Sequence, residues 1–525
     1  MRLSGNRSEP QRNRVSPDDD DHVPEAERDA LLTIVHGAVV TAGGVSGQRA
    51  LTTAAEIVLA RGLGPTAYGV YALAWRLAQL LFRIVTFGSV PALQRYLPAF
   101  EDDPARRNAV AGLAYATTVA FGAVIAAAIW LSAPQIDALT IRQPAFVPTM
   151  RLFGILVGLL GLVRVSASVL RAVGSARGEV LFDKLLRPAV RFAGALLALW
   201  LGYSVVGIAA LVVVAVALLV AVAIPLSARM TGVVPSLRGT RREAGRFYNH
   251  AAPVALSSLG KIFQNRLDVI LVGALLSAVA AGVYNAVLVL IAITWIPLLS
   301  FNQLLPPVAS DLYADGRTET LNAIYSSVTR LIVTTVAPIL ATMLVYGRDL
   351  LALFGATYTR GYLPLVVYLG GVFVGSAVGA TGWLLMMTDH QYVRMLLDWI
   401  LAVLNAGLTY VFIIRYGLVG AALGTSIAIA VQNGIQVLLL RRFEGLWPFD
   451  RTFLTPILAG VAGTVVMVAV RAAIAGPLAI GIGVPTGLLS YLGALHWIGL
   501  DPRDRFVVRE LAARYRTTIP RLRRS

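Results

Sequence analysis

The stretch that decides the fold is YGVYALAWRLAQLLFRI, which runs from Tyr68 to Ile84. It is apolar enough to lie in a lipid bilayer, yet it contains Arg76 and Arg83. An arginine at the centre of a bilayer costs about 3 kcal/mol on insertion scales. A membrane segment that keeps two arginines therefore indicates a helix that faces a bundle interior or a water-filled cavity.

The composition of the whole chain places it among polytopic membrane proteins. It has 525 residues, of which 57% are hydrophobic and 14% charged, and its mean hydropathy is +0.72. A soluble protein has roughly 25% charged residues. The absence of cysteine excludes disulfides, thiolate catalysis and zinc–thiolate sites.

Apolar stretches of roughly 20 residues, the length that crosses a bilayer, recur from about His36 onward. We predict an all-α fold of about fourteen transmembrane helices joined by short loops. The expected spans are 36–60, 68–93, 108–131, 148–171, 180–201, 204–226, 250–276, 280–304, 322–346, 362–387, 392–414, 417–440, 453–474 and 477–498.

The basic balance predicts membrane orientation. A net charge of +17 could indicate nucleic acid, but most cations lie in short loops between apolar stretches, so we expect no nucleic-acid partner. If both termini are cytoplasmic, the inner loops carry several times more cations than the outer ones. This bias predicts a multi-pass protein of the cytoplasmic membrane with both termini inside.

The two tails are polar. Residues 1–30 are expected to form a disordered cytoplasmic tail, in which DDDDH (18–22) is a solvated charge run rather than a metal site. In the basic tail 501–525, Asp501 and Pro502 are a typical helix start. That helix would lie on anionic lipid, or the tail would be a simple basic stop-transfer segment.

Internal repeats indicate a duplicated core. Gly69-Val70-Tyr71 is matched by Gly282-Val283-Tyr284, and VVGIAAL (205–211) by LVGAALG (418–424), both at an offset of 213 positions. We expect two six-helix lobes related by a pseudo-two-fold axis along the membrane normal, with a substrate site between them. The predicted parts are the lobes 31–230 and 250–440, a cytoplasmic linker 231–249 and two additional helices in 441–500.

The chain also resembles a known family. The stretches that carry the resemblance are LARGLGPTAYGVYAL (59–73), QNRLDVILVG (264–273), AAGVYNAV (280–287) and LNAGLTYVFIIRYGLVGAALGTSIA (404–428). In this order they are similar to the polysaccharide-biosynthesis flippases of the multidrug/oligosaccharidyl-lipid/polysaccharide exporter superfamily, over about residues 30 to 500. The resemblance implies a two-lobed bundle that moves a lipid-linked oligosaccharide across the membrane by alternating access.

Charged residues within the first predicted lobe follow helical spacing. Arg76 and Arg83 are seven residues apart, and so are Arg49 and Glu56, so each pair shares a helix face. Arginine forks bind phosphate oxygens and stay charged. We expect Arg49, Arg76, Arg83 and Arg164 to hold the phosphate of a lipid-linked sugar, with Glu56 as a counter-ion or coupling-ion ligand.

Structural interpretations stay open for several of these residues. Arg164 lies near a helix end and could extend toward the interface. Arg187 and Arg191 stand at steps of four from Asp183 and could form an ion network with it. Such pairs are common inside membranes and need not bind cargo.

The seventh predicted span carries a second polar stripe. Lys261, Asn265 and Asp268 lie at i, i+4 and i+7. Lys261 and Asn265 are candidates for cargo binding, and Asp268 for a counter-ion or coupling-ion ligand. Asp268 could equally neutralise Lys261 or its neighbour Arg266. Lesser candidates are Arg330, Asp398 and Asn405.

The remaining motifs favour a transporter without cofactors. The chain has no GxxxxGK[ST] phosphate loop, no metal-ligand spacing of histidines and no GxSxG element. The expected partners are a lipid-linked oligosaccharide and membrane lipids, with the protein a monomer and glycosyltransferases as candidate associates. The alternatives are a cation-coupled multidrug exporter of the same superfamily and a membrane glycosyltransferase or polysaccharide polymerase.

Overall fold

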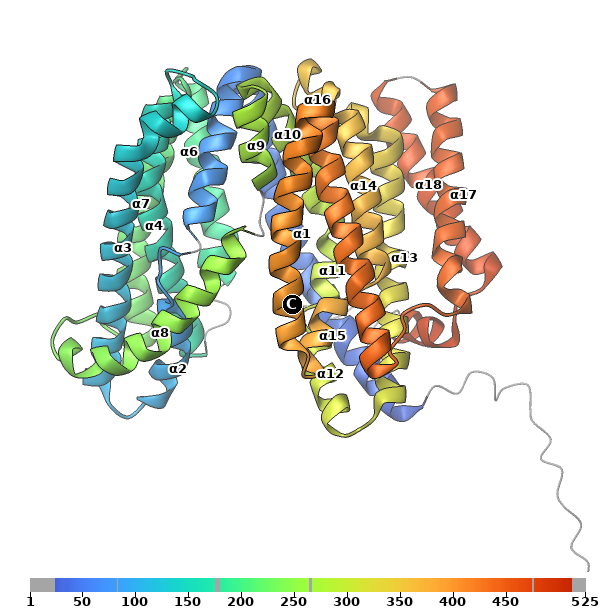
Figure 1. The fold of residues 1–525 in the computed structure, drawn as a ribbon, viewed down its shortest axis with the longest axis horizontal. Helices are drawn as coiled ribbons and strands as arrows, with labels where there is room; N and C mark the ends of the chain where they lie inside the picture. Colours follow the sequence, from blue (N-terminus) through green and yellow to red (C-terminus); the bar gives the residue numbers. More distant parts are fainter. Residues whose placement is uncertain (1–23, 83, 175–179, 264–266, 475, 512–525) are drawn as a thin grey trace, which may run out of the picture.

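The computed structural model describes residues 24–82, 84–174, 180–263, 267–474 and 476–511. Within these ranges the chain is helical and has no β-strand. The helices gather in two bundles that stand side by side (Figure 1). The predicted all-α class of membrane protein is confirmed, while the exact number of crossings stays a prediction.

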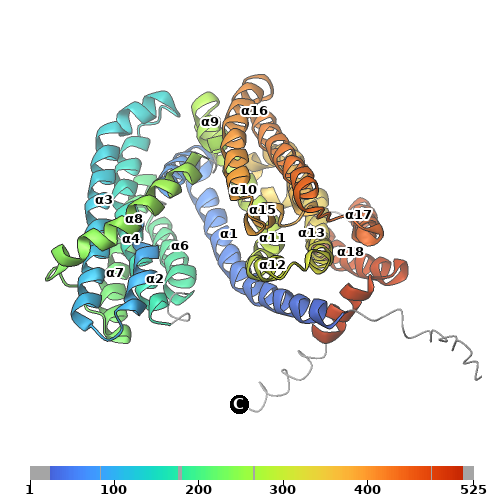
Figure 2. The same cartoon turned by 60° about the horizontal axis from the view of Figure 1, so that its bottom comes forward.

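The first bundle contains the helices that follow α1. Its members are α2 (Ser89–Ala99), α3 (Pro104–Leu139), α4 (Phe146–Ala172), a π-helical turn (Val180–Leu186), α6 (Arg187–Trp200) and α7 (Val205–Thr231). Small residues let α3 and α4 approach closely, because a Cβ added to Gly122 would lie 2.9 Å from the Cα of Gly158. From this bundle α8 (Thr240–Phe263) runs toward the second one (Figure 2).

The second bundle contains the remaining helices. They are α9 (Leu267–Leu275), α10 (Ala278–Thr294), α11 (Ile296–Phe301), α12 (Leu305–Ala314), α13 (Thr318–Ala352), a 3-10 turn (Ala356–Gly361), α14 (Tyr362–Ala377), α15 (Thr381–Met387), α16 (Gln391–Glu444), a short turn (Arg451–Phe453), α17 (Leu454–Ala473) and α18 (Pro477–Ile498).

The long helix α1 (Glu25–Leu81) connects the two bundles. It consists of two helices that meet at Gly64, whose φ of 75° is easily adopted only by glycine, just before Pro65. The start of the first of these helices packs on the second bundle, where Leu31 and Ile34 join a buried cluster with Tyr325. Part of the segment that the sequence assigned to the first lobe therefore lies against the second.

The labels α1 and α16 each cover two helices. The expected spans 36–60 and 68–93 meet at Gly64, whose φ of 75° and ψ of 171° are not helical; the second helix ends at Leu81, and a turn precedes α2. The spans 392–414 and 417–440 meet in the same way at Gly417, with a φ of 58° and a ψ of −133°. In both cases a glycine with positive φ allows the chain to turn between two helices with almost no intervening loop.

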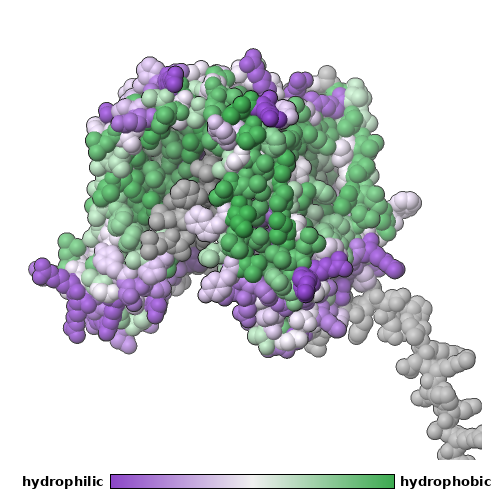
Figure 3. All heavy atoms as spheres, viewed as in Figure 1, coloured by the Kyte–Doolittle hydropathy of each residue, from purple (hydrophilic) through white to green (hydrophobic). Residues whose placement is uncertain are grey.

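The two glycines that define the sequence repeat are in contact. A Cβ added to Gly69 would lie 1.8 Å from the carbonyl oxygen of Ala278, and one added to Gly282 would lie 3.2 Å from the Cα of Gly69. The first residues of α10 therefore touch the backbone of α1. This contact joins the bundles at their upper ends (Figure 1), while a notch separates their lower ends (Figure 3).

On the side of the molecule shown in Figure 3, an apolar belt lies between two polar faces. Nine helices of the described residues are long and apolar enough to cross a membrane. Large apolar side chains face outward, for example Leu218 on α7 and Val465 on α17. An outward apolar surface of this height is stable in lipid and unfavourable in water, so the chain is a multi-pass membrane protein.

The C-terminal helix, residues 502–511, packs on the protein. Asp501 caps it by accepting a hydrogen bond from the backbone N–H of Arg503 at 3.0 Å, as the sequence indicated. Its apolar face does not lie on lipid, however, because Val507 is 2% exposed within the cluster that holds Leu31. Arg503 also pairs with Glu27 at 2.8 Å, which ties the helix to the start of α1.

Arg330 of α13 stabilises the end of the second bundle at which the C-terminal helix packs. Its side chain is 2% exposed and pairs with Asp450, with Asp501 at 3.0 Å and with Asp504 at 2.5 Å. Burial raises the pKa of the Asp504 carboxyl to about 6, although Arg330 lowers it. Arg330, a lesser candidate for cargo binding, is thus occupied by structural contacts.

Replacing Gly69 with alanine should destabilise the protein. The new methyl group would overlap the Ala278 carbonyl and force α1 away from α10. We expect the melting temperature of the protein in detergent to fall by several degrees. The matched control is Gly43→Ala in the same helix, where nothing lies within 4 Å and alanine is favoured by about 1 kcal/mol. Equal melting of the two variants would contradict the contact.

Replacing Arg330 with methionine should leave its carboxylates without a counter-ion, a change that typically costs about 3–5 kcal/mol. The folded-state pKa of Asp504 then rises further. A carboxyl group whose pKa is raised in the folded state stabilises the protein at low pH, and this contribution is lost as the pH rises. The variant should therefore regain stability as the pH falls from about 7.5 to about 5. Thermal melting measures this, with the exposed Arg317→Met as control. A loss of stability that does not depend on pH would refute the assignment.

Candidate functional site

Two polar cavities are lined by described residues, and α1 contributes to both. The first, of about 140 Å³, lies mainly against the first bundle, and the second, of about 400 Å³, mainly against the second. Arg49 lines both cavities. It lies fifteen residues before Gly64, about 22 Å along a helix, and therefore well below the contact at the upper ends.

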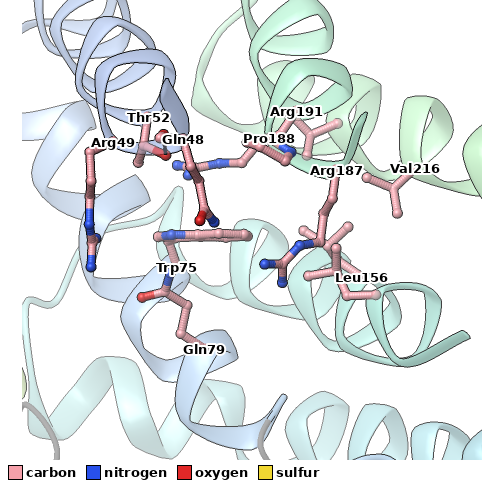
Figure 4. A pocket seen from close by; sticks show the side chains of 12 residues that line it. Gln48, Arg49, Thr52, Trp75, Gln79, Leu156, Arg187, Pro188, Arg191 and Val216 are labelled. Carbon is pink, nitrogen blue, oxygen red and sulfur yellow. Dashed lines mark hydrogen bonds between the residues drawn. The ribbon is translucent and has the colours of Figure 1, made fainter. Parts of the chain in front are cut away.

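The first cavity is a cationic site. Arg49, Arg187 and Arg191 line it together with Trp75 and Gln79. In Figure 4, Arg49 and Arg187 lie on opposite sides of Trp75. None of the described residues that line this cavity is acidic. Because guanidinium groups stay charged at any physiological pH, the cavity favours an anion.

Arg191 is neutralised by Glu56. The two side chains form a salt bridge of 2.8 Å, and both are buried. Glu56 also accepts a hydrogen bond from the Tyr68 hydroxyl at 2.9 Å, and Arg191 donates to the Tyr71 hydroxyl at 3.1 Å. The guanidinium lies 3.9 Å from the ring centre of Trp75. Glu56 is therefore a counter-ion in this structure, and a coupling role for it stays a prediction.

Arg76 faces the second bundle and lines neither of the two cavities. Its Nε donates to the side-chain oxygen of Asn285 at 2.8 Å, and Nη1 donates to Gln79 at 3.1 Å. Asn285 in turn donates to the Tyr68 hydroxyl at 2.7 Å. From the sequence, Arg76 was expected to bind the cargo, because its contact with Asn285 of α10 could not be foreseen. In this conformation it belongs to a polar contact between the bundles.

Arg164 lies beside the first cavity. Its guanidinium carbon is 5.4 Å from the ring centre of Phe82, and so is that of Arg187. The two cations thus approach the same aromatic ring, which favours them through its electron-rich face. Arg164 is half-buried and does not itself line the cavity, so its predicted role in binding stays a prediction.

The second cavity has mixed charge. Asp268 lines it and accepts a hydrogen bond from Tyr284 at 3.1 Å. Farther along, Asp398 pairs with Arg394 at 3.2 Å and accepts a hydrogen bond from Gln432 at 2.8 Å. The lesser candidate Asn405 also lines this cavity, as do Trp295 and Tyr368.

Three predicted residues cannot be placed. Arg83 and Asn265 lie outside the described residues, as does the side chain of Lys261 in α8. Their proposed contact with cargo stays a prediction. Arg191 pairs with Glu56, while the predicted ion network of Arg187 and Arg191 with Asp183 stays a prediction, because the side chain of Asp183 lies outside the described residues.

Sequence reasoning missed several residues that line the cavities. Arg187 was noticed for its spacing and considered for an ion network, but its place in the lining of the first cavity was not foreseen. Trp295, Arg394 and Gln432 were not singled out. A signal was available for Arg394, since Asp398 follows it at the i, i+4 distance of a helical ion pair. Trp295 carries no such signal, because it lies in an apolar segment.

The two bundles and the polar cavities between apolar outer faces define a two-lobed membrane transporter fold. A multidrug resistance MATE family transporter of the MOP superfamily, in its inward-facing conformation, is similar with a TM-score of 0.65 at 17% identity, over 76% of this chain and 94% of that one. The lipid II flippase MurJ, in an inward closed conformation, is similar with a TM-score of 0.67 at 14% identity, over 87% and 98%.

The family follows from the sequence match. The model of the polysaccharide biosynthesis protein family matches residues 58–364, more than half of the chain. The chain therefore belongs to this family. One curated relative is the probable low-salt glycan biosynthesis flippase Agl15 of Haloferax volcanii, which is 22% identical over 206 residues. That match covers 39% of this chain and 44% of the relative, less than half of each.

Replacing Glu56 alone should destabilise the protein more than replacing both members of its ion pair. Glu56→Ala leaves the buried Arg191 without a counter-ion and should lower stability by about 3–5 kcal/mol. The double variant Glu56→Ala/Arg191→Met removes both charges and should melt at a higher temperature than Glu56→Ala. Melting curves of the wild type, both single variants and the double variant measure this coupling. Additive losses would show that Glu56 is not the counter-ion of Arg191.

Proposed function

We propose that this protein is a flippase that moves a lipid-linked phosphate or diphosphate oligosaccharide across the cytoplasmic membrane by alternating access. Such transport would serve the assembly of surface polysaccharide or of glycoprotein glycans. The observation that carries the proposal is the first cavity, which arginines line and no described acidic residue does. The proposal is also supported by the similarity of the chain to Agl15 and to the lipid II flippase, both of which are named as flippases.

The charge balance of the first cavity supports an anionic cargo. Arg191 is offset by Glu56, and the lining of the cavity also includes the cationic groups of Arg49 and Arg187. A guanidinium binds two phosphate oxygens at once, and such charge-assisted hydrogen bonds are about twice as strong as neutral ones. A phosphate brought into this cavity supplies the negative charge that makes the arginines tolerable inside a membrane.

The arrangement of the bundles supports alternating access. The upper ends meet at Gly69 and Gly282, whereas the lower ends are separated by the notch in Figure 3. The predicted orientation turns the notch toward the cytoplasm, where lipid-linked precursors would enter. Transporters built from two repeats commonly work by rocking one repeat against the other around a central site. Parting of the glycine contact would open the upper side in this scheme.

The multidrug exporter alternative has the same fold, as the MATE neighbour indicates. A cationic drug requires accessible acidic groups, and the two carboxylates that line the second cavity are both engaged. Asp268 accepts from Tyr284, and Asp398 is bound by Arg394 and Gln432. The cationic first cavity is unfavourable for such cargo, so the flippase function is the better supported of the two.

Loss of the cavity arginines should weaken lipid binding. In nanodiscs, Arg49→Ala and Arg187→Ala should each lower the affinity for undecaprenyl diphosphate by about 10- to 100-fold, since a hydrogen bond to a charged group contributes roughly 1.5–3 kcal/mol. Native mass spectrometry or a fluorescence displacement assay measures the affinity. The control is Arg229→Ala, an exposed arginine in the last turn of α7. Unchanged affinity in both cavity variants, with normal folding, would refute the phosphate site.

A further inference from the structure

The second cavity differs from the first in a way that points to a different ligand. It has a volume of about 400 Å³, within the roughly 300–1,000 Å³ of small-molecule sites. The first, at about 140 Å³, is smaller. The two cavities share Arg49, so a ligand held by this residue reaches both.

The charges around the second cavity cancel. Arg49 and Arg394 are offset by Asp268 and Asp398 among the described lining residues. Arg394 and Asp398 are moreover paired with each other at 3.2 Å. This site therefore has no net electrostatic preference for an anion or a cation, and suits an uncharged polar ligand.

The polar groups offer both donors and acceptors on planar side chains. The carboxylate of Asp398 is held by Gln432 at 2.8 Å and by Arg394, while the buried Nη1 of Arg394 has no hydrogen-bond partner among the described residues. Adjacent hydroxyl groups each donate and accept, so they match such a set. The aromatic side chain of Trp295 lines the same cavity and offers an apolar face with a polar edge.

We infer that the second cavity is a saccharide-binding subsite, which holds the sugar units next to the phosphate of the cargo. Gln432, Asp398 and Arg394 bind the hydroxyls, and Trp295 covers an apolar face of a sugar ring. Arg49 binds the phosphate at the junction of the two cavities. The inference rests on the proposed flippase function and adds to it that the protein distinguishes glycosylated carrier lipid from bare carrier lipid.

The test compares two kinds of lipid in nanodiscs. One is undecaprenyl diphosphate, and the other is the same lipid bearing one sugar, taken in turn as glucose, galactose, mannose or N-acetylglucosamine. At least one sugar should raise the affinity of the wild type by about tenfold, the effect of one or two net hydrogen bonds. Gln432→Ala and Trp295→Ala should abolish this gain and leave the affinity for the bare lipid unchanged.

Controls separate this inference from the proposed function. Arg187→Ala should weaken binding of both lipids by the same factor, and Asn433→Ala, beside Gln432 but outside the cavity lining, should change neither. If Trp295→Ala does not fold, Gln432→Leu tests the same subsite. The inference is overturned if no sugar raises the affinity, or if the Gln432 variants weaken the bare lipid equally. Failure of the wild type to bind either lipid overturns the proposed function itself.

Discussion

The constraint on which this structure depends is the high free energy of a guanidinium group inside a hydrocarbon layer. The fold meets it in a different way for each arginine. Arg191 is paired with Glu56, Arg76 bonds to Asn285 across the two bundles, and Arg330 is surrounded by carboxylates. Arg49 and Arg187 line a cavity together with Arg191. The contacts of Arg191, Arg76 and Arg330 stabilise the fold, and the cavity surface that arginines form is suited to an external anion.

The bent helix α1 connects these elements mechanically as well as electrostatically. The helix before Gly64 packs on the second bundle and carries Arg49 and Glu56, and the helix after it supplies Gly69 to the contact at the upper ends. A change of angle at Gly64 would therefore shift the closing contact relative to the cavity and the counter-ion, which is the kind of hinge movement that an alternating-access cycle uses.

Much of the fold could be predicted from the sequence, and the site only in part. Hydropathy and the 213-residue repeat indicate the helices and the duplication, but not that Gly69 and Gly282 touch, because a repeat offset carries no information on which copies meet in space. Helical spacing predicted arginines that face inward; Arg76 is buried in the structure, while Arg83 lies outside the described residues. Helical spacing could not show that Arg76 bonds to Asn285 while Arg187 lines the cavity. Asn285 and the residues that line the cavity come from segments far apart in the chain. Long-range pairings of this kind require coordinates.

The most direct test of this account is an experimental structure of the protein in a nanodisc with undecaprenyl diphosphate bearing one sugar. The account requires density for a phosphate within hydrogen-bond distance of Arg49 or Arg187, with the attached sugar directed toward Gln432. A headgroup bound outside both cavities, with Arg49 and Arg187 directed away from it, would contradict the view that cavity arginines are retained for an anionic cargo.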